Sequence, residues 1–399
     1  MKKYLLLFIL VIAPAAHSQS SFTFDNKRGP YSVGLRAVFQ YDESRSYVRA
    51  APTAPSDATL ASAAPIPTAP PASRPIQTLI WYPANASSNP LTYGDYIEFG
   101  VNRENFNLAA SEITRLADEM LKAYRWAPEQ IALEKVRVQW ASRDAPPASG
   151  KFPVVIYAPS FRSPAYENSD LCEYLASHGY VVIASPSQGV DDKGMTIDRA
   201  GLDAQVSDIH YLMRYASSIP EADTTQIAII GFSWGGISNA FAAVDRPAVR
   251  ALVFLDGSIR YYTQLVEQFN LNSGRRFNIP FLYFSQRPPS FRDQQAKMDA
   301  GDKVLAKLTS KSLYLVTMNF MSHQDHSSLF IREFGRKLYA AATPEEVSAS
   351  YGAMAQYVQR FLDAVLKNDK AGLAFMARSP LANKIPPSMM RLQTIRGTR

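Results

Sequence analysis

The hexapeptide Gly-Phe-Ser-Trp-Gly-Gly at residues 231–236 carries the clearest chemical signal in this sequence. It directly follows an apolar run at 226–230 and precedes a segment of helical character. A tight strand-to-helix turn needs glycines beside the serine, and it leaves the serine hydroxyl exposed at the edge of a sheet. The helix N-terminus there also directs amide N–H groups at developing negative charge. The pattern therefore predicts Ser233 as a nucleophile; the weaker interpretation is a glycine-rich turn with an incidental serine.

A serine hydroxyl is a poor nucleophile at neutral pH, so a histidine must accept its proton. His323 and His326 follow the apolar run at 312–318, where the chain order serine, acid, histidine places the base. We favour His323, with His326 as the alternative. His178 precedes an expected strand and so should lie at the opposite edge of the sheet, and His210 lies inside a helical segment.

The histidine in turn needs a carboxylate that orients it. Asp256 directly follows the apolar run at 249–255 and should lie at the same sheet edge as Ser233. A buried carboxylate needs a partner, which a catalytic histidine supplies. The alternative interpretation is a strand-end aspartate that turns the chain at Gly257. Asp293, several residues beyond a later strand, is the reserve candidate.

An oxyanion formed at a carbonyl needs two N–H donors. The amide of Trp234, which follows the nucleophile, should be the first. The second should come from the loop at 159–163, which follows an expected strand. Pro159 has no N–H group. We therefore expect the second donor to be the amide of Phe161.

Six short apolar runs recur from residue 152 onward, and helical segments separate most of them. Such runs are typical of parallel strands buried on both faces. Their alternation with helices predicts an α/β fold with a doubly wound, mostly parallel sheet. The last helix should begin at a capping box formed by Thr343 and Glu346. The expected strands lie at 153–159, 180–186, 226–232, 249–257, 280–286 and 312–318, and the expected helices at 169–177, 200–218, 236–244 and 344–367.

The N-terminal part adds a β extension and a helical insertion to this pattern. Residues 31–41 and 75–84 alternate in the manner of strands. Between them, residues 51–75 are rich in Ala, Pro, Ser and Thr, which indicates a flexible excursion within one domain. Residues 106–124 predict a helix that packs on the core, with a lid over a cleft as the alternative. Residues 370–399 form a basic tail to which we assign no element.

Residues 1–18 have the organisation of a secretory signal peptide. Lys2 and Lys3 precede an apolar run from Leu5 to Ile12, and small residues lie before Gln19. That run is shorter than the ~20 residues needed to span a bilayer. No later stretch is apolar enough to span one. We therefore expect a secreted or periplasmic protein whose mature chain, residues 19–399, is a single domain without an integral membrane segment.

The composition excludes several classes of protein. The chain has 399 residues, of which 47% are hydrophobic, so disorder, collagen and coiled coil are ruled out as its main state. The formal charge of +7 falls to +5 without Lys2 and Lys3, and no Lys/Arg-rich run is present, so no nucleic-acid partner is indicated. The single cysteine, Cys172, forms neither an internal disulfide nor a thiolate zinc site.

With these residues placed, the chain resembles the platelet-activating-factor acetylhydrolase and dienelactone hydrolase-like branch of the α/β-hydrolases, from residue 31 to about 367. The resemblance implies the α/β-hydrolase fold and a triad of Ser233 in GFSWGG, Asp256 in FLDG and His323 in SHQDH. It also favours Asp256 over Asp293. The branch usually has His-Gly at the oxyanion loop, where this chain has Pro159-Ser160. The other matching segments are VGLRAVFQYDESR, IQTLIWYPA, FPVVIYAPS and LASHGYVVIASP.

These observations favour a serine esterase that acts on a small-molecule or polymeric ester through an acyl-enzyme and needs no cofactor or metal. A serine peptidase or amidase is the first alternative, because the same triad cleaves amides. An inactive hydrolase-fold protein that binds a ligand or partner is the second, because the oxyanion loop is altered. Aromatic residues such as Trp126, Tyr166 and Tyr261 either line an acyl site or belong to the core, and the core is favoured.

Overall fold

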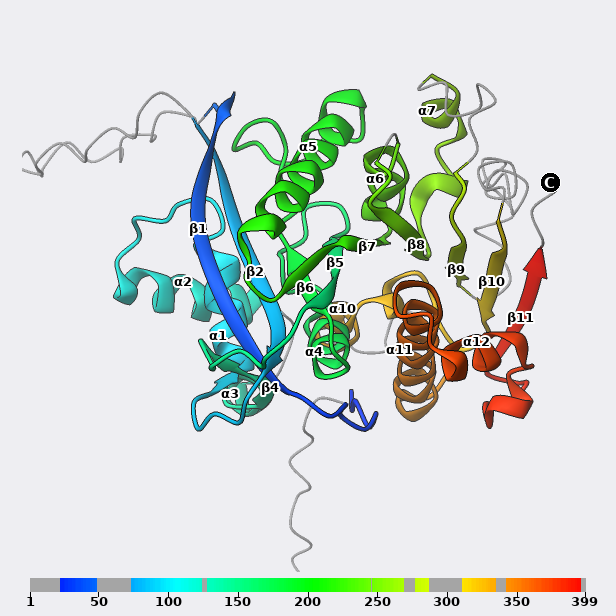
Figure 1. The fold of residues 1–399 in the computed structure, drawn as a ribbon. Coiled ribbons are helices and arrows are strands. Elements are labelled where there is room, and N and C mark those ends of the chain that lie inside the picture. The colour runs from blue at the N-terminus through cyan, green and yellow to red at the C-terminus, as the bar shows by residue number, and fades with distance from the viewer. Residues whose placement is uncertain are drawn as a thin grey trace, which may run out of the picture.

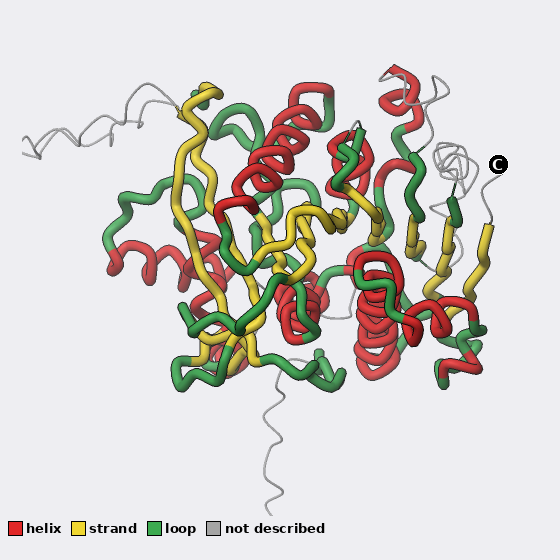
Figure 2. The backbone as a smooth tube through the Cα atoms, viewed as in Figure 1, coloured by secondary structure: helices red, strands yellow, loops and turns green. Residues whose placement is uncertain are grey.

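The computed structural model describes residues 22–48, 73–123, 128–244, 246–268, 277–286, 311–334 and 342–395. Among these residues, 11 strands form one sheet in the order β11-β10-β9-β8-β7-β5-β6-β2-β1-β4-β3. Figure 2 shows them as one continuous layer. The strands are β1 (Ser32–Ser46), β2 (Ser73–Ala84), β3 (Pro90–Thr92), β4 (Val138–Arg143), β5 (Phe152–Ala158), β6 (Val181–Ala184), β7 (Ala222–Phe232), β8 (Val249–Leu255), β9 (Phe281–Ser285), β10 (Leu313–Met318) and β11 (Met390–Ile395).

The middle of the sheet is parallel, as the continuous apolar runs predict. Strands β6, β5, β7, β8, β9 and β10 are neighbours that all run in one direction. The long ribbon of β1 and β2 joins this centre in antiparallel fashion through the pairing of β2 with β6. The predicted fold class is therefore confirmed: a mostly parallel α/β sheet with an N-terminal β extension.

Helices cover both faces of the sheet, which is why its central strands are apolar throughout. Successive residues of β5 point to opposite faces: Val155 packs in the core layer that contains α4 and α11, and Ile156 packs in the layer that contains α5 and α6. Figure 1 shows these two helix pairs on opposite sides of the sheet. The four helices are α4 (Ser169–Ser177), α5 (Arg199–Tyr215), α6 (Trp234–Ala242) and α11 (Pro344–Leu366).

The strand order reverses at β5 and thereby fixes where a site can form. From β5 the chain crosses through α4 to β6 on one side, and β7 pairs with β5 on the other side. The loops that leave the carboxyl ends of β5 and β7 therefore diverge at a topological switch point, where open α/β sheets bind their ligands.

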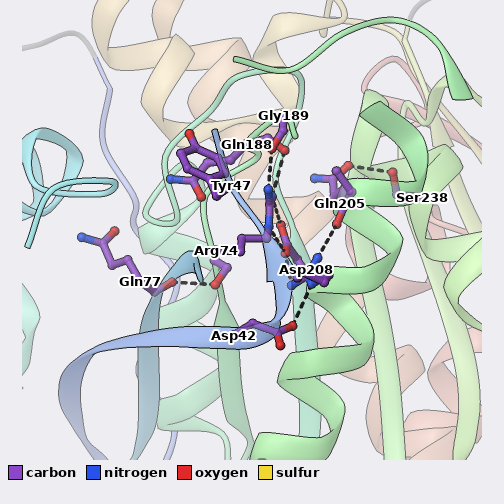
Figure 3. A network of polar contacts seen from close by, with 12 residues as sticks. Asp42, Tyr47, Arg74, Gln77, Gln188, Gly189, Gln205, Asp208 and Ser238 are labelled. Carbon is purple, nitrogen blue, oxygen red and sulfur yellow. Dashed lines mark hydrogen bonds and ion pairs between the residues drawn. The ribbon is translucent and has the colours of Figure 1, made fainter. Parts of the chain in front are cut away.

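A buried charge network ties the β1–β2 ribbon to α5 (Figure 3). Arg74, at the start of β2, is 2% exposed and binds the Asp208 carboxylate through two nitrogens at 2.7 and 2.6 Å. The remaining Arg74 donors reach the backbone carbonyls of Gln188 and Gly189. Arg45 of β1 binds the same Asp208 carboxylate at 2.7 Å. This network fixes the ribbon against the helix that borders the switch point.

The helical insertion and the C-terminal tail contain more structure than the sequence pattern predicts. The insertion has three helices, α1 (Tyr93–Val101), α2 (Ala110–Ala123) and α3 (Pro128–Lys135), where the periodicity indicated one at 106–124. The basic tail forms α12 (Lys370–Ala377) and the strand β11, which pairs with β10. Short, weakly periodic segments of this kind are stabilised by tertiary packing and by pairing at the sheet edge rather than by their own pattern.

Several expectations fall outside the described residues: the signal peptide at 1–18, most of the excursion at 51–75, Trp126, and Asp293. Residues 73–75, expected in that excursion, belong to β2 instead. The capping box of Thr343 and Glu346 is present at the start of α11. Within the described ranges, no helix has the length and apolarity to cross a membrane.

Candidate active site

Ser233 lies at the tip of a sharp turn between β7 and α6. Its φ of 50° and ψ of −116° are a conformation that non-glycine residues rarely adopt. The turn is held because the Ser233 amide donates to the Leu255 carbonyl at 3.1 Å and the Ser233 carbonyl accepts from Ser258 at 2.7 Å. Gly235 lets this turn approach β5, since a Cβ there would overlap the Ala158 carbonyl. The hydroxyl is thereby presented at the switch point on a half-buried residue.

Asp256 lies directly after β8 and is fully buried. Its amide donates to the Phe284 carbonyl at 2.8 Å, and one carboxylate oxygen accepts from the Gln286 amide at 3.3 Å. Burial by itself raises the pKa of the Asp256 carboxyl, but the hydrogen bond from His323 and the positive charge that this ring carries when protonated outweigh it and lower the pKa below its ordinary value. The carboxylate is therefore ionised next to the imidazole.

His323 joins the other two residues. Its Nδ1 lies 2.6 Å from Asp256 Oδ2, and its Nε2 lies 2.8 Å from Ser233 Oγ. Because an ionised carboxylate only accepts, Nδ1 donates to Asp256, and Nε2 is left to accept from the serine hydroxyl. The ring of Phe232 packs at 5.1 Å from the imidazole. The structure thus brings together all three residues proposed from the sequence, in hydrogen-bonded order.

His326, the alternative base, is directed away from the serine. It is fully buried, and its Nδ1 lies 3.0 Å from the Ser322 carbonyl. Burial lowers the pKa of His326, because a buried imidazolium loses its hydration. Its backbone carbonyl accepts from Asn168 at 3.0 Å. Contacts of this kind fix the loop that carries His323.

Two further histidines of the described residues, His178 and His210, lie where the sequence places them. His178 ends α4 next to Gly179, whose φ is +85°, and its Nδ1 lies 2.8 Å from the Tyr174 carbonyl. His210 is within α5, and its Nε2 lies 2.9 Å from the Ala242 carbonyl. Neither residue makes a hydrogen bond to Ser233, His323 or Asp256.

The loop after β5 leaves the amide of Phe161 free at the site. Pro159 has no N–H, and the Ser160 N–H donates to Glu167 Oε2 at 2.9 Å. The amides of Phe161 and Trp234 make no hydrogen bond with the described part of the protein. The side chains of these two residues are in edge-on contact, with centroids 6.3 Å apart. Both amides expected as oxyanion donors are therefore available.

Two polar residues that support this loop are not indicated by the sequence pattern. Glu167 and Gln205 are both buried, and both bind the backbone of 159–160. The sequence offers one hint of this role: Glu167 is a charged residue in the loop directly before α4. Of the aromatic candidates for an acyl site, Tyr166 is 1% exposed in the core. Across the described ranges, no group of three or more His, Cys, Asp and Glu residues could hold a metal ion.

The architecture matches a solved structure along nearly its whole length. A ferulic acid esterase from Streptomyces cinnamoneus superposes with a TM-score of 0.61, and the match covers 94% of this chain and 99% of the other. The chain has the α/β-hydrolase fold. At 18% sequence identity, this likeness to the esterase concerns the fold alone.

Two sequence comparisons agree with an α/β-hydrolase of the expected branch. The family model described as Chlorophyllase matches residues 142–255, from β4 to the end of β8. A Methylorubrum extorquens protein with the provisional name carboxymethylenebutenolidase is 28% identical over 137 residues. That match covers 32% of this chain and 45% of the relative, so it spans less than half of that protein. The resemblance to the dienelactone hydrolase-like branch is confirmed.

Proposed function

We propose that this α/β-hydrolase is a serine esterase that cleaves carboxylic esters through an acyl-enzyme. The observation that carries the proposal is the His323 ring, which contacts the Ser233 hydroxyl on one side and the buried Asp256 carboxylate on the other. This is the order of donor and acceptor that nucleophilic catalysis by serine requires. The names of the matched proteins, an esterase and a butenolide hydrolase, support ester cleavage as the reaction class.

In the proposed first half-reaction, Ser233 Oγ attacks the ester carbonyl carbon and its proton passes to His323 Nε2. Asp256 holds the ring in the correct tautomer and stabilises the imidazolium. The amides of Phe161 and Trp234 stabilise the oxyanion. When the carbonyl re-forms, the C–O bond to the alcohol breaks, and the alcohol leaves with the proton from His323.

In the second half-reaction a water molecule takes the place of the alcohol. His323 accepts a proton from the water, which attacks the acyl carbon, and the acid leaves as Ser233 recovers its proton. The side chain of His323 is 36% exposed, so water reaches this base. We further propose that the protein is exported, because residues 1–18 have the pattern of a cleaved signal peptide.

The test compares the mature wild-type protein with Ser233→Ala. Both are incubated with a fluorophosphonate probe and with p-nitrophenyl esters of increasing acyl length. We expect labelling and turnover that disappear in the variant, and the chain-length profile then defines the acyl preference. A well-folded wild-type protein that is neither labelled nor active would refute the esterase and favour a binding protein of the same fold.

A further inference from the structure

Glu167 is a fully buried carboxylate beside the loop that follows β5. Its Oε2 accepts from the Ser160 amide at 2.9 Å and from the Tyr157 hydroxyl at 2.8 Å. Its Oε1 accepts from the Ser160 hydroxyl. Two of these three donors therefore belong to Ser160, the residue directly before the free amide of Phe161.

A second buried side chain holds the same loop from the opposite face of the sheet. Gln205 of α5 donates from Nε2 to the Pro159 carbonyl at 2.8 Å. Gln205 is itself fixed because its Oε1 accepts from Ser238 of α6 at 2.6 Å (Figure 3). The Pro159 carbonyl and the Ser160 N–H are the two polar ends of one peptide group, and each is held by a buried partner. The next N–H along the chain, that of Phe161, is unpaired at the site.

The backbone of Glu167 reaches the loop that carries the base. Its carbonyl accepts from the Ser327 hydroxyl at 3.0 Å and from the Leu329 amide at 3.1 Å. The neighbouring Asn168 donates to the His326 carbonyl at 3.0 Å and accepts from the Ser328 amide at 2.8 Å. One short segment therefore connects the loop of the oxyanion donor with the loop of His323.

We propose that Glu167 is a positioning residue for the oxyanion hole: by binding the Ser160 amide, its side-chain oxygen directs the Phe161 N–H toward the carbonyl under attack. The proposal rests on the serine esterase function proposed above. It explains how a loop that begins with Pro159, which has no N–H, still presents a donor at the site. The essential property of Glu167 is an acceptor at the position of Oε2, because the Ser160 N–H would otherwise be a buried unpaired donor that pulls the loop toward another partner.

Two substitutions of Glu167 differ in whether they keep this acceptor. In Glu167→Gln, the amide oxygen replaces Oε2 and the NH₂ group faces the Ser160 hydroxyl, which is free to accept and to donate to Ser163, 2.9 Å away. Glu167→Met keeps a side chain of similar length and removes the acceptor. We expect kcat within about threefold of wild type for Gln, and a fall of about 10- to 100-fold for Met with little change in KM, somewhat less than the ~10²- to 10³-fold cost of deleting an oxyanion donor.

Glu173 provides a matched control on α4. It is also buried, and its carboxylate accepts from the Tyr96 hydroxyl at 2.6 Å and the Trp140 amide at 2.8 Å, away from the loop after β5. We expect Glu173→Met to lower the melting temperature to a similar extent as Glu167→Met while kcat per folded molecule stays at the wild-type value. Circular dichroism measures the folded fraction for each variant.

Steady-state kinetics with a p-nitrophenyl ester decide among the outcomes. The proposal would be overturned if Glu167→Met kept the wild-type kcat. It would also be overturned if Glu167→Met and Glu173→Met lost kcat equally, or if kcat in Glu167→Gln were as low as in Glu167→Met. If Glu167→Met does not fold, Glu167→Asp takes its place. The aspartate side chain is shorter by one carbon, about 1.5 Å, so its carboxylate does not reach Ser160 and Tyr157 together. We expect the same fall in kcat, and a wild-type kcat in this variant would refute the proposal. An inert, unlabelled wild-type protein would instead refute the esterase function and this role with it.

Discussion

Gly236 and Gly257 pack backbone against backbone: a Cβ on Gly236 would overlap the Cα of Gly257. The first residue belongs to the turn that presents Ser233, and the second follows Asp256 directly. The absence of both side chains lets the turns after β7 and β8 touch. This contact sets the short separation that a single imidazole ring bridges.

We predict that Gly236→Ala separates these turns. The added methyl group has no space, so we expect a loss of about 1–3 kcal/mol in the free energy of unfolding from overpacking, together with a fall in kcat because the spacing between Ser233 and Asp256 changes. Urea unfolding and ester kinetics measure the two effects. A variant with wild-type stability and turnover would show that the contact does not set the geometry.

The proposed triad predicts graded losses. Ser233→Ala and His323→Ala should each lower kcat by several orders of magnitude, and Asp256→Asn by about 10⁴-fold because it favours the wrong tautomer of the histidine. The double variant of Ser233 and His323 should be little worse than either single variant, because the residues act as a unit. Melting temperatures close to wild type show that folding is retained. Additive losses would contradict the model of a single unit.

The two neighbouring histidines should differ sharply. His326→Asn keeps a donor near the Ser322 carbonyl, so we expect kcat within about tenfold of wild type and a stability loss of about 1–3 kcal/mol from the smaller buried side chain. His323→Asn should abolish turnover. A kinetic comparison at one pH, corrected for the folded fraction, distinguishes the two; equal loss of kcat in both variants would contradict the assignment of His323.

The buried network of Figure 3 predicts a large stability effect. Asp208→Asn leaves Arg74, which is 2% exposed, without its charged partner, and we expect a cost of about 3–5 kcal/mol. Replacing the pair together, as Arg74→Met with Asp208→Leu, should recover most of that loss because no buried charge is left unpaired. Urea unfolding of the three proteins tests this. No recovery in the double variant would mean that the hydrogen bonds of Arg74 to the 188–189 backbone dominate.

Glu173 predicts a pH dependence of stability. Burial raises the pKa of this carboxyl to about 7 from its ordinary value of 4.5. The folded protein therefore binds the proton more tightly than the unfolded chain, so a stabilisation that is fully present below about pH 4.5 is lost as the pH rises through 7. The difference corresponds to about 3 kcal/mol. Denaturation of wild type and Glu173→Gln across pH 4 to 8 should show this decline only in wild type; parallel curves would contradict it.

The sequence by itself determined the parallel centre of the sheet and the three residues of the proposed triad. Continuous apolar runs are required wherever helices cover both faces of a strand, and a serine between glycines at a strand-to-helix turn has few other uses. Because parallel strands end at one edge, the residue after β8 and the loop after β10 had to lie near Ser233. Chain order narrowed the base to His323 or His326, and the resemblance to the dienelactone hydrolase-like branch favoured His323. The missing N–H of Pro159 favoured Phe161 as the second donor.

Only the tertiary structure decided which groups satisfy the buried polar atoms around that site. Glu167 and Gln205 come from different elements, and nothing in their local sequence shows that both bind the 159–160 backbone, because a hydrogen bond between distant segments leaves no periodic pattern. The sequence pattern also did not predict the full three-helix insertion or the pairing of β11 with β10. Their stability comes from contacts with other parts of the chain, and such contacts exist only once the sheet has formed.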